Sequence, residues 1–150
     1  MKPRILIFIE GTILDDRAIL YLKVTKHESG YLRRLGEAVP VEGAVEFCKN
    51  ICQQFDVVYH GSRGEEQRPL YQEWLQKHGF PEGELVVGGY KTAKLPQGIK
   101  FAVDDRVQDA EDYYPKFGIQ LIPVNEYCAR WEKVVDKITN PIFNSIFEKT

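Results

Sequence analysis

Two adjacent carboxylates, Asp104 and Asp105, stand directly after the apolar run 99–103. If this run is a buried strand, both carboxylates lie at the edge of a sheet. Oxygen ligands of this kind suit a hard cation such as magnesium. The same pair can instead cap a helix that begins near Val107, because aspartate is a common N-cap residue. The pair is therefore a candidate magnesium site whose meaning depends on the neighbouring strands.

Two other polar segments follow apolar runs in the same way. The sequence Glu-Gly-Thr at 10–12 ends the run 5–9, and His-Gly-Ser-Arg at 60–63 ends the run 55–59. Ligands of open parallel sheets bind outside the carboxyl ends of the strands. We therefore expect both segments to be neighbours of Asp104 and Asp105 in space. His60 is the imidazole expected nearest this crevice, where a hydrogen-bonded structural role is favoured over a role as base or phosphoryl acceptor.

The elements that must position these residues alternate along the chain. Strands are predicted at 5–9, 55–59, 84–87, 99–103 and 118–124, and a further strand or hairpin arm at 19–24. Helices are predicted at 42–53, 69–78, 107–116, 126–138 and 142–148. Such alternation implies right-handed βαβ crossovers. The predicted fold class is α/β, a three-layer Rossmann-like, doubly wound, mostly parallel sheet.

The order of the polar segments resembles the four motifs of haloacid-dehalogenase-like (HAD-like) phosphohydrolases. Those motifs are Asp-x-Asp-Gly-Thr, a Ser or Thr after the second strand, a lysine, and an Asp-Asp pair. The resemblance spans roughly residues 5–125, and the members that the sequence resembles are of the capless or small-cap type. It implies a single HAD-like domain over 1–150, with a short cap or hairpin insertion around 13–40, and an open site.

The resemblance also assigns candidate site residues. Those implied for phosphate binding are Thr12, Ser62, Lys91 and Lys94, the two lysines being alternatives for one position. Those implied for magnesium are Glu10, Asp104 and Asp105. Glu10 matches the family's general acid and base, with a side chain one methylene longer.

The departures from the motifs bear most on function. Phe8 stands where the family has its nucleophilic aspartate, and phenylalanine can neither attack phosphorus nor bind a cation. The phosphate-binding hydroxyl position falls on Gly61, so that Ser62 is displaced by one residue. The resemblance therefore implies weak magnesium binding and an impaired covalent route.

Composition excludes several other classes. The chain is 43% hydrophobic and 28% charged, which is ordinary globular usage, and its formal net charge of -2 makes nonspecific nucleic-acid binding unlikely. Cys48 and Cys52 lie four apart in a predicted helix, where they are expected to act as small apolar side chains in a reducing compartment. No leader pattern or membrane-length apolar run is present at the start, so we expect a cytoplasmic protein without a membrane partner.

Three hypotheses follow. The first is a catalytically silent HAD-like domain whose crevice is vestigial or binds a phosphorylated small molecule or a protein partner. The second is an active magnesium-dependent phosphoric monoester hydrolase acting on a nucleotide, a nucleic-acid end or another phosphorylated substrate, using Glu10 with Asp104 or Asp105. The third is a structural or assembly subunit with aromatic interface segments at 113–115 and 141–147. The oligomeric state and the substrate are left open.

Overall fold

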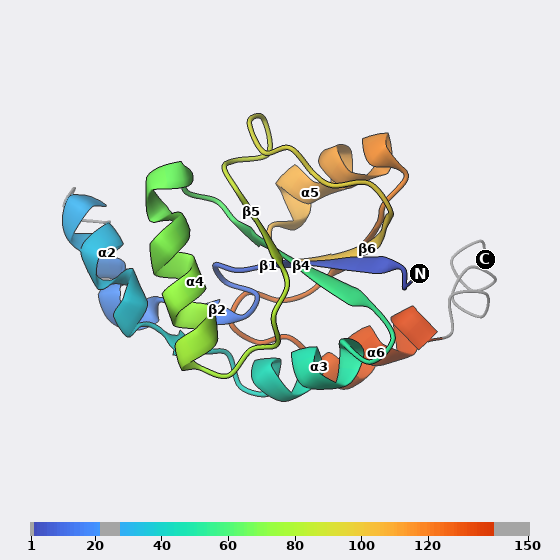
Figure 1. The fold of residues 1–150 in the computed structure, drawn as a ribbon, viewed down its shortest axis with the longest axis horizontal. Coiled ribbons are helices and arrows are strands. Elements are labelled where there is room, and N and C mark those ends of the chain that lie inside the picture. The colour runs from blue at the N-terminus through green and yellow to red at the C-terminus, as the bar shows by residue number, and fades with distance from the viewer. Residues whose placement is uncertain (1, 22–27, 140–150) are drawn as a thin grey trace.

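The computed structural model describes residues 2–21 and 28–139. It centres on a parallel sheet of five strands (Figure 1). The strand order is β5-β4-β1-β6-β7. The bounds are β1 (Arg4–Phe8), β4 (Asp56–Gly61), β5 (Glu84–Val87), β6 (Ile99–Asp104) and β7 (Gln120–Pro123). The predicted α/β class with a mostly parallel sheet is confirmed.

β1 is the central strand and is hydrogen-bonded on both sides. It pairs with β4, placing Phe8 beside His60, and with β6, placing Ile7 beside Val103. Successive side chains of a strand point to opposite faces. Leu6 and Phe8 therefore face one side of the sheet and Ile7 faces the other. Both faces are covered, which explains why the run reads as continuously apolar.

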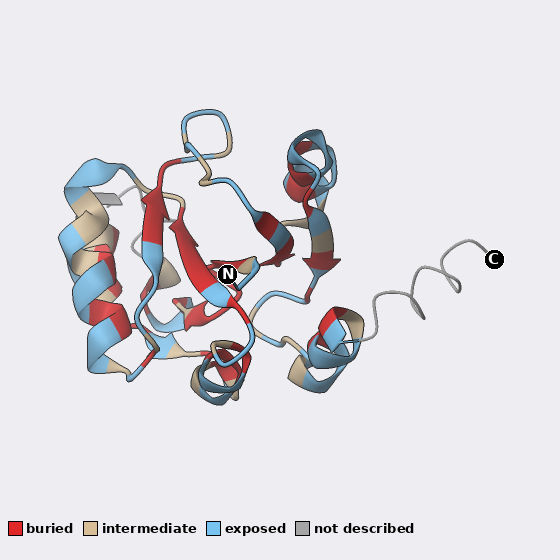
Figure 2. Ribbon diagram, turned by 45° about the vertical axis from the view of Figure 1, so that its right-hand side comes forward, coloured by how far each residue is buried: buried red, intermediate tan, exposed pale blue. Residues whose placement is uncertain are grey.

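Helices form a layer on each face of the sheet (Figures 1 and 2). The helices α3 (Ala44–Ile51), α4 (Arg68–Lys77) and α6 (Trp131–Thr139) pack in the larger core with Ile5 and Ile7. The other face is covered by α5 (Val107–Tyr113) and the 3-10 segment η4 (Tyr114–Phe117). Figure 2 shows buried strands between helices whose outer sides are exposed. The architecture therefore has three layers, as predicted.

The apolar residues whose spacing predicted α3 form the face that this helix buries. Ala44, Phe47, Cys48 and Ile51 recur at helical intervals, and all four are buried. Burial raises the pKa of the Cys48 thiol, so this residue behaves as a small apolar side chain. The three cysteines are free.

The segment 13–40 adds a small antiparallel pair beside the main sheet. β2 (Leu14–Asp15) pairs with β3 (Val39–Pro40). Between them lie η1 (Arg17–Ile19), α2 (Glu28–Arg34) and η2 (Leu35–Glu37). A further 3-10 segment, η3 (Glu65–Gln67), precedes α4.

Two sequence predictions need correction. The strand predicted at 19–24 is wrong for residues 19–21, which are helical, and 22–27 lie outside the described residues. Ile19 is buried but Tyr21 is 53% exposed, so within residues 19–21 it is Ile19 that packs into the core. The helix predicted from residue 126 begins only at Trp131, because Tyr127 adopts a left-handed backbone with φ 60°.

The remaining helix predictions differ in outcome. The helix predicted over 107–116 is observed as α5 followed by η4, which contains Pro115. The helix predicted at 142–148 lies outside the described residues. Within residues 2–21 and 28–139, no helix is long and apolar enough to cross a lipid bilayer.

Candidate functional site

The last residue of β1, Phe8, is 1% exposed and is enclosed by aromatic and cationic groups. Its ring meets the imidazole of His60 edge to face, with the ring centroids 5.2 Å apart. The ring of Tyr90 stacks on it at 6.0 Å, and the Arg106 guanidinium lies 5.0 Å from its centroid. Position 8, which corresponds to the family nucleophile, therefore carries a packed aromatic ring and has no nucleophilic group of its own.

Glu10 lies just beyond β1 and accepts hydrogen bonds from the loop that follows β4. The hydroxyl of Ser62 donates to its carboxylate at 2.5 Å, and the backbone N–H of Ser62 lies 3.2 Å from the other oxygen. The hydroxyl of Tyr71, from α4, donates at 2.9 Å. The fold thus brings Glu10 and Ser62 together, as expected for residues that follow neighbouring parallel strands, and they are hydrogen-bonded to each other.

Gly61 accounts for the displaced serine. A Cβ atom at this position would lie 2.4 Å from Cζ of Tyr71. Burial raises the pKa of the Tyr71 hydroxyl, which therefore stays protonated and donates to Glu10. A side chain at position 61 and the Tyr71 ring cannot occupy the same space, so a serine does not fit at position 61, and the hydroxyl is carried by residue 62.

Asp104 is fully buried at the end of β6 and accepts three hydrogen bonds. The hydroxyls of Tyr90 and Tyr114 donate to Oδ2 at 2.7 Å and 2.8 Å. The backbone N–H of Arg106 donates to Oδ1 at 2.9 Å. Burial raises the pKa of Asp104, and these donors oppose that rise by stabilising the carboxylate.

Asp105 is paired with Thr12, which is fully buried. The Thr12 hydroxyl donates to Oδ1 of Asp105 at 2.8 Å. Burial raises the pKa of Asp105 to about 7. Glycine is required at position 11, where the loop after β1 approaches the end of β6, because its φ is +88° and a Cβ atom would lie 2.3 Å from Oδ2 of Asp105.

The residues present do not form a preassembled magnesium site. Glu10, Asp104 and Asp105 each direct their carboxylates to different hydroxyl donors. Among residues 2–21 and 28–139, no three His, Cys, Asp or Glu side chains are grouped so that they could hold a metal ion. The assignment of these three residues to magnesium stays a prediction.

The two candidate lysines lie in the connection between β5 and β6. Lys91 and Lys94 are both exposed, whereas the half-buried Tyr90 enters the crevice and contacts Phe8. The choice between the lysines, and their role toward phosphate, stays a prediction.

A cavity of about 150 Å³ opens beside Glu10. Arg63 and Arg106 line it, and the guanidinium of Arg63 lies 5.1 Å from the centroid of the Tyr31 ring. The remaining lining residues are Glu10, Gly11, Asp16, Leu20, Tyr31, Glu126 and Tyr127. The two arginines place cationic groups at the same sheet edge as the motif residues.

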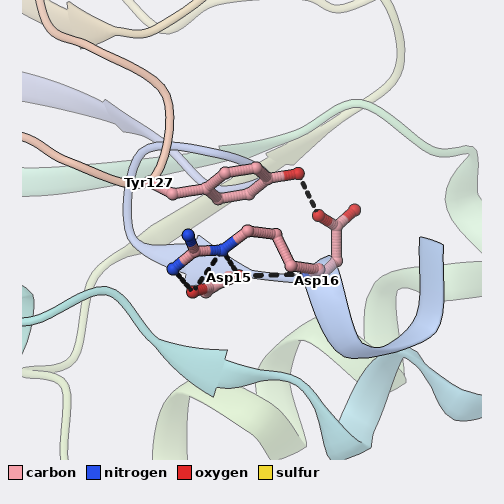
Figure 3. A network of polar contacts seen from close by, with 4 residues as sticks. Asp15, Asp16 and Tyr127 are labelled. Carbon is pink, nitrogen blue, oxygen red and sulfur yellow. Dashed lines mark hydrogen bonds and ion pairs between the residues drawn. The ribbon is translucent and has the colours of Figure 1, made fainter.

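Tyr127 joins the loop after β7 to the loop after β1 (Figure 3). Its backbone N–H donates to the Gly11 carbonyl at 2.8 Å, and its hydroxyl donates to Asp16. The guanidinium of Arg17 lies 5.0 Å from the centroid of its ring and forms an ion pair with Asp15 at 2.6 Å. Asp16 also accepts a hydrogen bond from Tyr31 at 2.5 Å. These contacts hold the left-handed backbone of Tyr127 and build one wall of the cavity.

His60 has the hydrogen-bonded structural role that the sequence favoured. Its Nε2 lies 2.7 Å from the Gly88 carbonyl, so Nε2 carries the proton and donates it. Desolvation lowers the pKa of His60, although Asp104 and Glu10 oppose this, and the imidazole is neutral.

The tyrosines of the site were missed by sequence reasoning. Tyr71, Tyr90, Tyr114 and Tyr127 each donate a hydrogen bond to a carboxylate at the sheet edge. Tyr114, which the sequence placed in a candidate interface segment at 113–115, is fully buried and binds Asp104 instead. The one available indication was the tyrosine content, eight residues in 150.

Comparisons with known proteins identify the fold. No protein-family model matches the sequence, and no curated protein matches it significantly. A chain in the structure of the Pnkp1/Rnl/Hen1 complex matches with a TM-score of 0.61 at 13% identity, covering 83% of this chain and 47% of that one. This chain thus spans about half the length of that neighbour.

Two bacterial structures match in the same way. The class C acid phosphatase from Bacillus anthracis, solved with tungstate, has a TM-score of 0.59 at 18% identity, covering 88% of this chain and 70% of its own. The HAD hydrolase YfnB from Bacillus subtilis, solved with magnesium, has a TM-score of 0.56 at 14% identity, covering 87% and 93%. The chain therefore has a HAD-like fold, which confirms the resemblance seen in the sequence.

The packing at Gly61 gives a first prediction. Gly61→Ala should lower the free energy of unfolding by about 1–3 kcal/mol, because the new methyl group displaces the Tyr71 ring and its bond to Glu10. Gly89→Ala is the matched control, since a Cβ atom there meets nothing within 4 Å. Urea unfolding of both variants measures the difference, and equal stabilities would contradict the described packing.

The neutral His60 predicts a pH dependence of stability. Its folded-state pKa is lowered, so the unfolded chain takes up a proton first, near its ordinary pKa of about 6.5. Wild type should therefore lose stability relative to His60→Gln as pH falls from 7 to 5. Denaturant unfolding across this range measures the difference between the two proteins. Parallel curves would show that His60 does not resist protonation.

Proposed function

We propose that this chain is a HAD-like domain that does not hydrolyse phosphoesters through an aspartyl-phosphate and that uses its crevice for binding. The observation that carries the proposal is the buried ring of Phe8 between His60 and Tyr90. A covalent route needs a nucleophile at this strand end. Phe8 supplies none, and it also leaves a magnesium ion without one carboxylate.

The hydrogen bonds of the remaining carboxylates support the same reading. Glu10 is bound by Ser62 and Tyr71, so its use as an acid or base would require breaking these contacts. Asp104 is bound by two tyrosine hydroxyls. We expect magnesium affinity to be weak, because binding would have to compete with donors that already satisfy the buried oxygens.

The crevice is proposed to bind a phosphorylated ligand. Arg63 and Arg106 line the cavity, and planar guanidinium groups match the geometry of phosphate oxygens. Two of the acidic lining residues, Glu10 and Asp16, accept hydrogen bonds from tyrosines, which offsets part of their charge. At about 150 Å³ the cavity is smaller than a pocket for a whole drug-sized ligand, so it would admit one phosphoryl group of a larger molecule.

Two alternative functions are tested by the same experiments. The acid phosphatase and the magnesium-bound hydrolase among the structural neighbours favour an active magnesium-dependent phosphatase. The neighbour solved within the Pnkp1/Rnl/Hen1 complex favours a protein partner or an assembly role. The free cysteines are in keeping with action in the reducing cytoplasm.

Catalytic silence predicts the outcome of a phosphatase assay. Wild type should show no hydrolysis of p-nitrophenyl phosphate above background at any magnesium concentration. Hydrolysis by wild type that is abolished by Glu10→Ala or Asp104→Asn would establish an active enzyme and refute the proposal. Each variant is compared with wild type by circular dichroism, so that loss of folding is not read as loss of catalysis.

Restoring the nucleophile separates the contribution of Phe8 from that of the other changes. Phe8→Asp should lower the free energy of unfolding by at least about 3 kcal/mol, because it removes a buried ring and buries a carboxylate near Asp104. We expect no hydrolysis by this variant, since Glu10 and Asp104 keep their hydroxyl donors. Phe8→Leu, which keeps the site apolar, is the stability control. Magnesium-dependent hydrolysis by Phe8→Asp would show that only the nucleophile is missing.

Phosphate binding predicts a thermal shift. If inorganic phosphate binds with a Kd of about 1 mM, 10 mM phosphate adds about 1.4 kcal/mol and raises the Tm by roughly 3–5 °C. The double variant Arg63→Gln, Arg106→Gln should lose this shift, whereas Lys133→Gln, an exposed change on α6, should keep it. The double variant Lys91→Gln, Lys94→Gln tests the two lysines. No shift in wild type would refute the phosphate part of the proposal.

A further inference from the structure

A basic groove of about 230 Å³ lies between the end of β7 and α6. Its charged lining residues are Arg130, Lys133 and Lys137, and none of the described residues that line it is acidic. The chain as a whole has a formal net charge of -2, so this surface has the opposite sign to the protein. The groove shares no lining residue with the cavity that contains Arg63 and Arg106. It is therefore a separate surface.

Helical spacing gathers the three cations into one row along α6. Lys133 and Lys137 are one turn apart. The carbonyl of Arg130 accepts the backbone N–H groups of Lys133 and Val134 at 3.0 Å and 3.2 Å, so Arg130 stands one turn before Lys133. These three positions fall within about 60° around the helix axis and form a row roughly 10 Å long. Glu132 is on another side of α6, where it lines a separate hollow beside α3.

The basic row has no acidic partner in the part of the chain that the structure describes. None of its three side chains forms an ion pair or a hydrogen bond with residues 2–21 or 28–139. Like charges four residues apart on a helix repel each other, and the first turn, which contains Lys133, disfavours a cation. The row therefore lowers the stability of the free protein, and an anionic partner would relieve the repulsion.

We propose that the basic groove binds an acidic segment of a protein partner. The apolar side chains of Ile122, Val124 and Val134 line the groove together with the basic row. A segment that carries both carboxylates and apolar side chains matches this combination. Carboxylates one helical turn apart on a partner helix would have the same spacing as the cations of the row, which gives charge complementarity along its whole length.

Other anionic partners match the groove less well. No aromatic residue lines it, so the bases of a nucleic acid would find no side chain to stack on. Addition of a strand to the edge of β7 is also disfavoured. The Val124 N–H donates to the Asp104 carbonyl of β6 at 3.1 Å, so the backbone of the preceding residue, Pro123, faces outward and has no N–H to offer. Recognition in this groove therefore depends on side chains.

The test is the binding of a fluorescein-labelled helical peptide that carries one row of glutamates, measured by fluorescence anisotropy at low ionic strength. The triple variant Arg130→Gln, Lys133→Gln, Lys137→Gln should weaken binding at least about tenfold. Its Tm should equal or exceed that of wild type, because the repulsion along α6 is removed. A loss of binding is then not a loss of folding. Failure of wild type to bind the peptide would overturn the proposal.

The matched control removes the same charge from other elements. Lys49, Lys77 and Lys100 are exposed on α3, α4 and β6, outside the groove. The triple variant Lys49→Gln, Lys77→Gln, Lys100→Gln should keep the affinity of wild type within about twofold. Equal weakening by the two triple variants would show general attraction to a charged peptide and would contradict a specific groove.

Reversal of charge tests direct contact. Lys133→Glu, Lys137→Glu should reject the glutamate peptide and bind a peptide that has lysines at the same positions. Failure to bind the lysine peptide would count against docking on α6. A labelled single-stranded oligonucleotide tests the rival occupant. If it binds wild type more tightly than the peptide does and the groove variant loses it, a nucleic acid occupies the groove and the proposal is wrong.

The groove and the crevice can be tested independently. Arg63→Gln, Arg106→Gln should bind the glutamate peptide as wild type does, and loss of binding in this variant would place the acidic segment in the crevice instead. A single phosphate ion cannot span a row roughly 10 Å long, so Lys133→Gln remains a control for phosphate binding in the crevice.

Discussion

The buried carboxylate of Asp104 is the constraint on which the crevice depends. A charge at a fully buried position is costly unless donors surround it, and here they are the hydroxyls of Tyr90 and Tyr114 with one backbone N–H. The hydrogen bond to Asp104 fixes Tyr90, and the fixed ring of Tyr90 then stacks on Phe8. The aromatic residue in the nucleophile position and the retained acidic residue are therefore parts of one packed arrangement.

The acidic motif residues have structural roles that do not depend on the missing nucleophile at position 8. Glu10 links the first loop to the second strand through Ser62 and to α4 through Tyr71. Asp105 links the end of β6 to Thr12. Removing either carboxylate would leave a buried donor without its acceptor, which costs free energy. Each carboxylate therefore has a structural role in addition to any catalytic one. An Asp-Asp pair after a strand is accordingly evidence for the fold before it is evidence for a metal.

The sheet could be predicted from the sequence because strands that are buried on both faces must be continuously apolar, as residues 5–8 and 101–103 are. The position of Glu10 beside Ser62 followed from the meeting of strand ends at one edge. The tyrosine donors could not be predicted, because each comes from a different element and reaches its carboxylate only through tertiary packing. The helix prediction for residues 126–130 was wrong for a similar reason. Their composition suits a helix, but the hydrogen bonds of Tyr127 with Gly11 and Asp16 hold the backbone in a non-helical conformation.

The central place of β1 has a consequence for how the chain reaches this structure. Ile5 is paired with Val57 on one side and Phe101 on the other, so the central strand acquires its second neighbour only after all the intervening elements have been synthesised. Contacts so distant along the sequence slow folding, because a long loop must close before they form. The continuously apolar strand β1 therefore stays exposed until β6 has been made, and exposed apolar strands of this kind favour aggregation during folding.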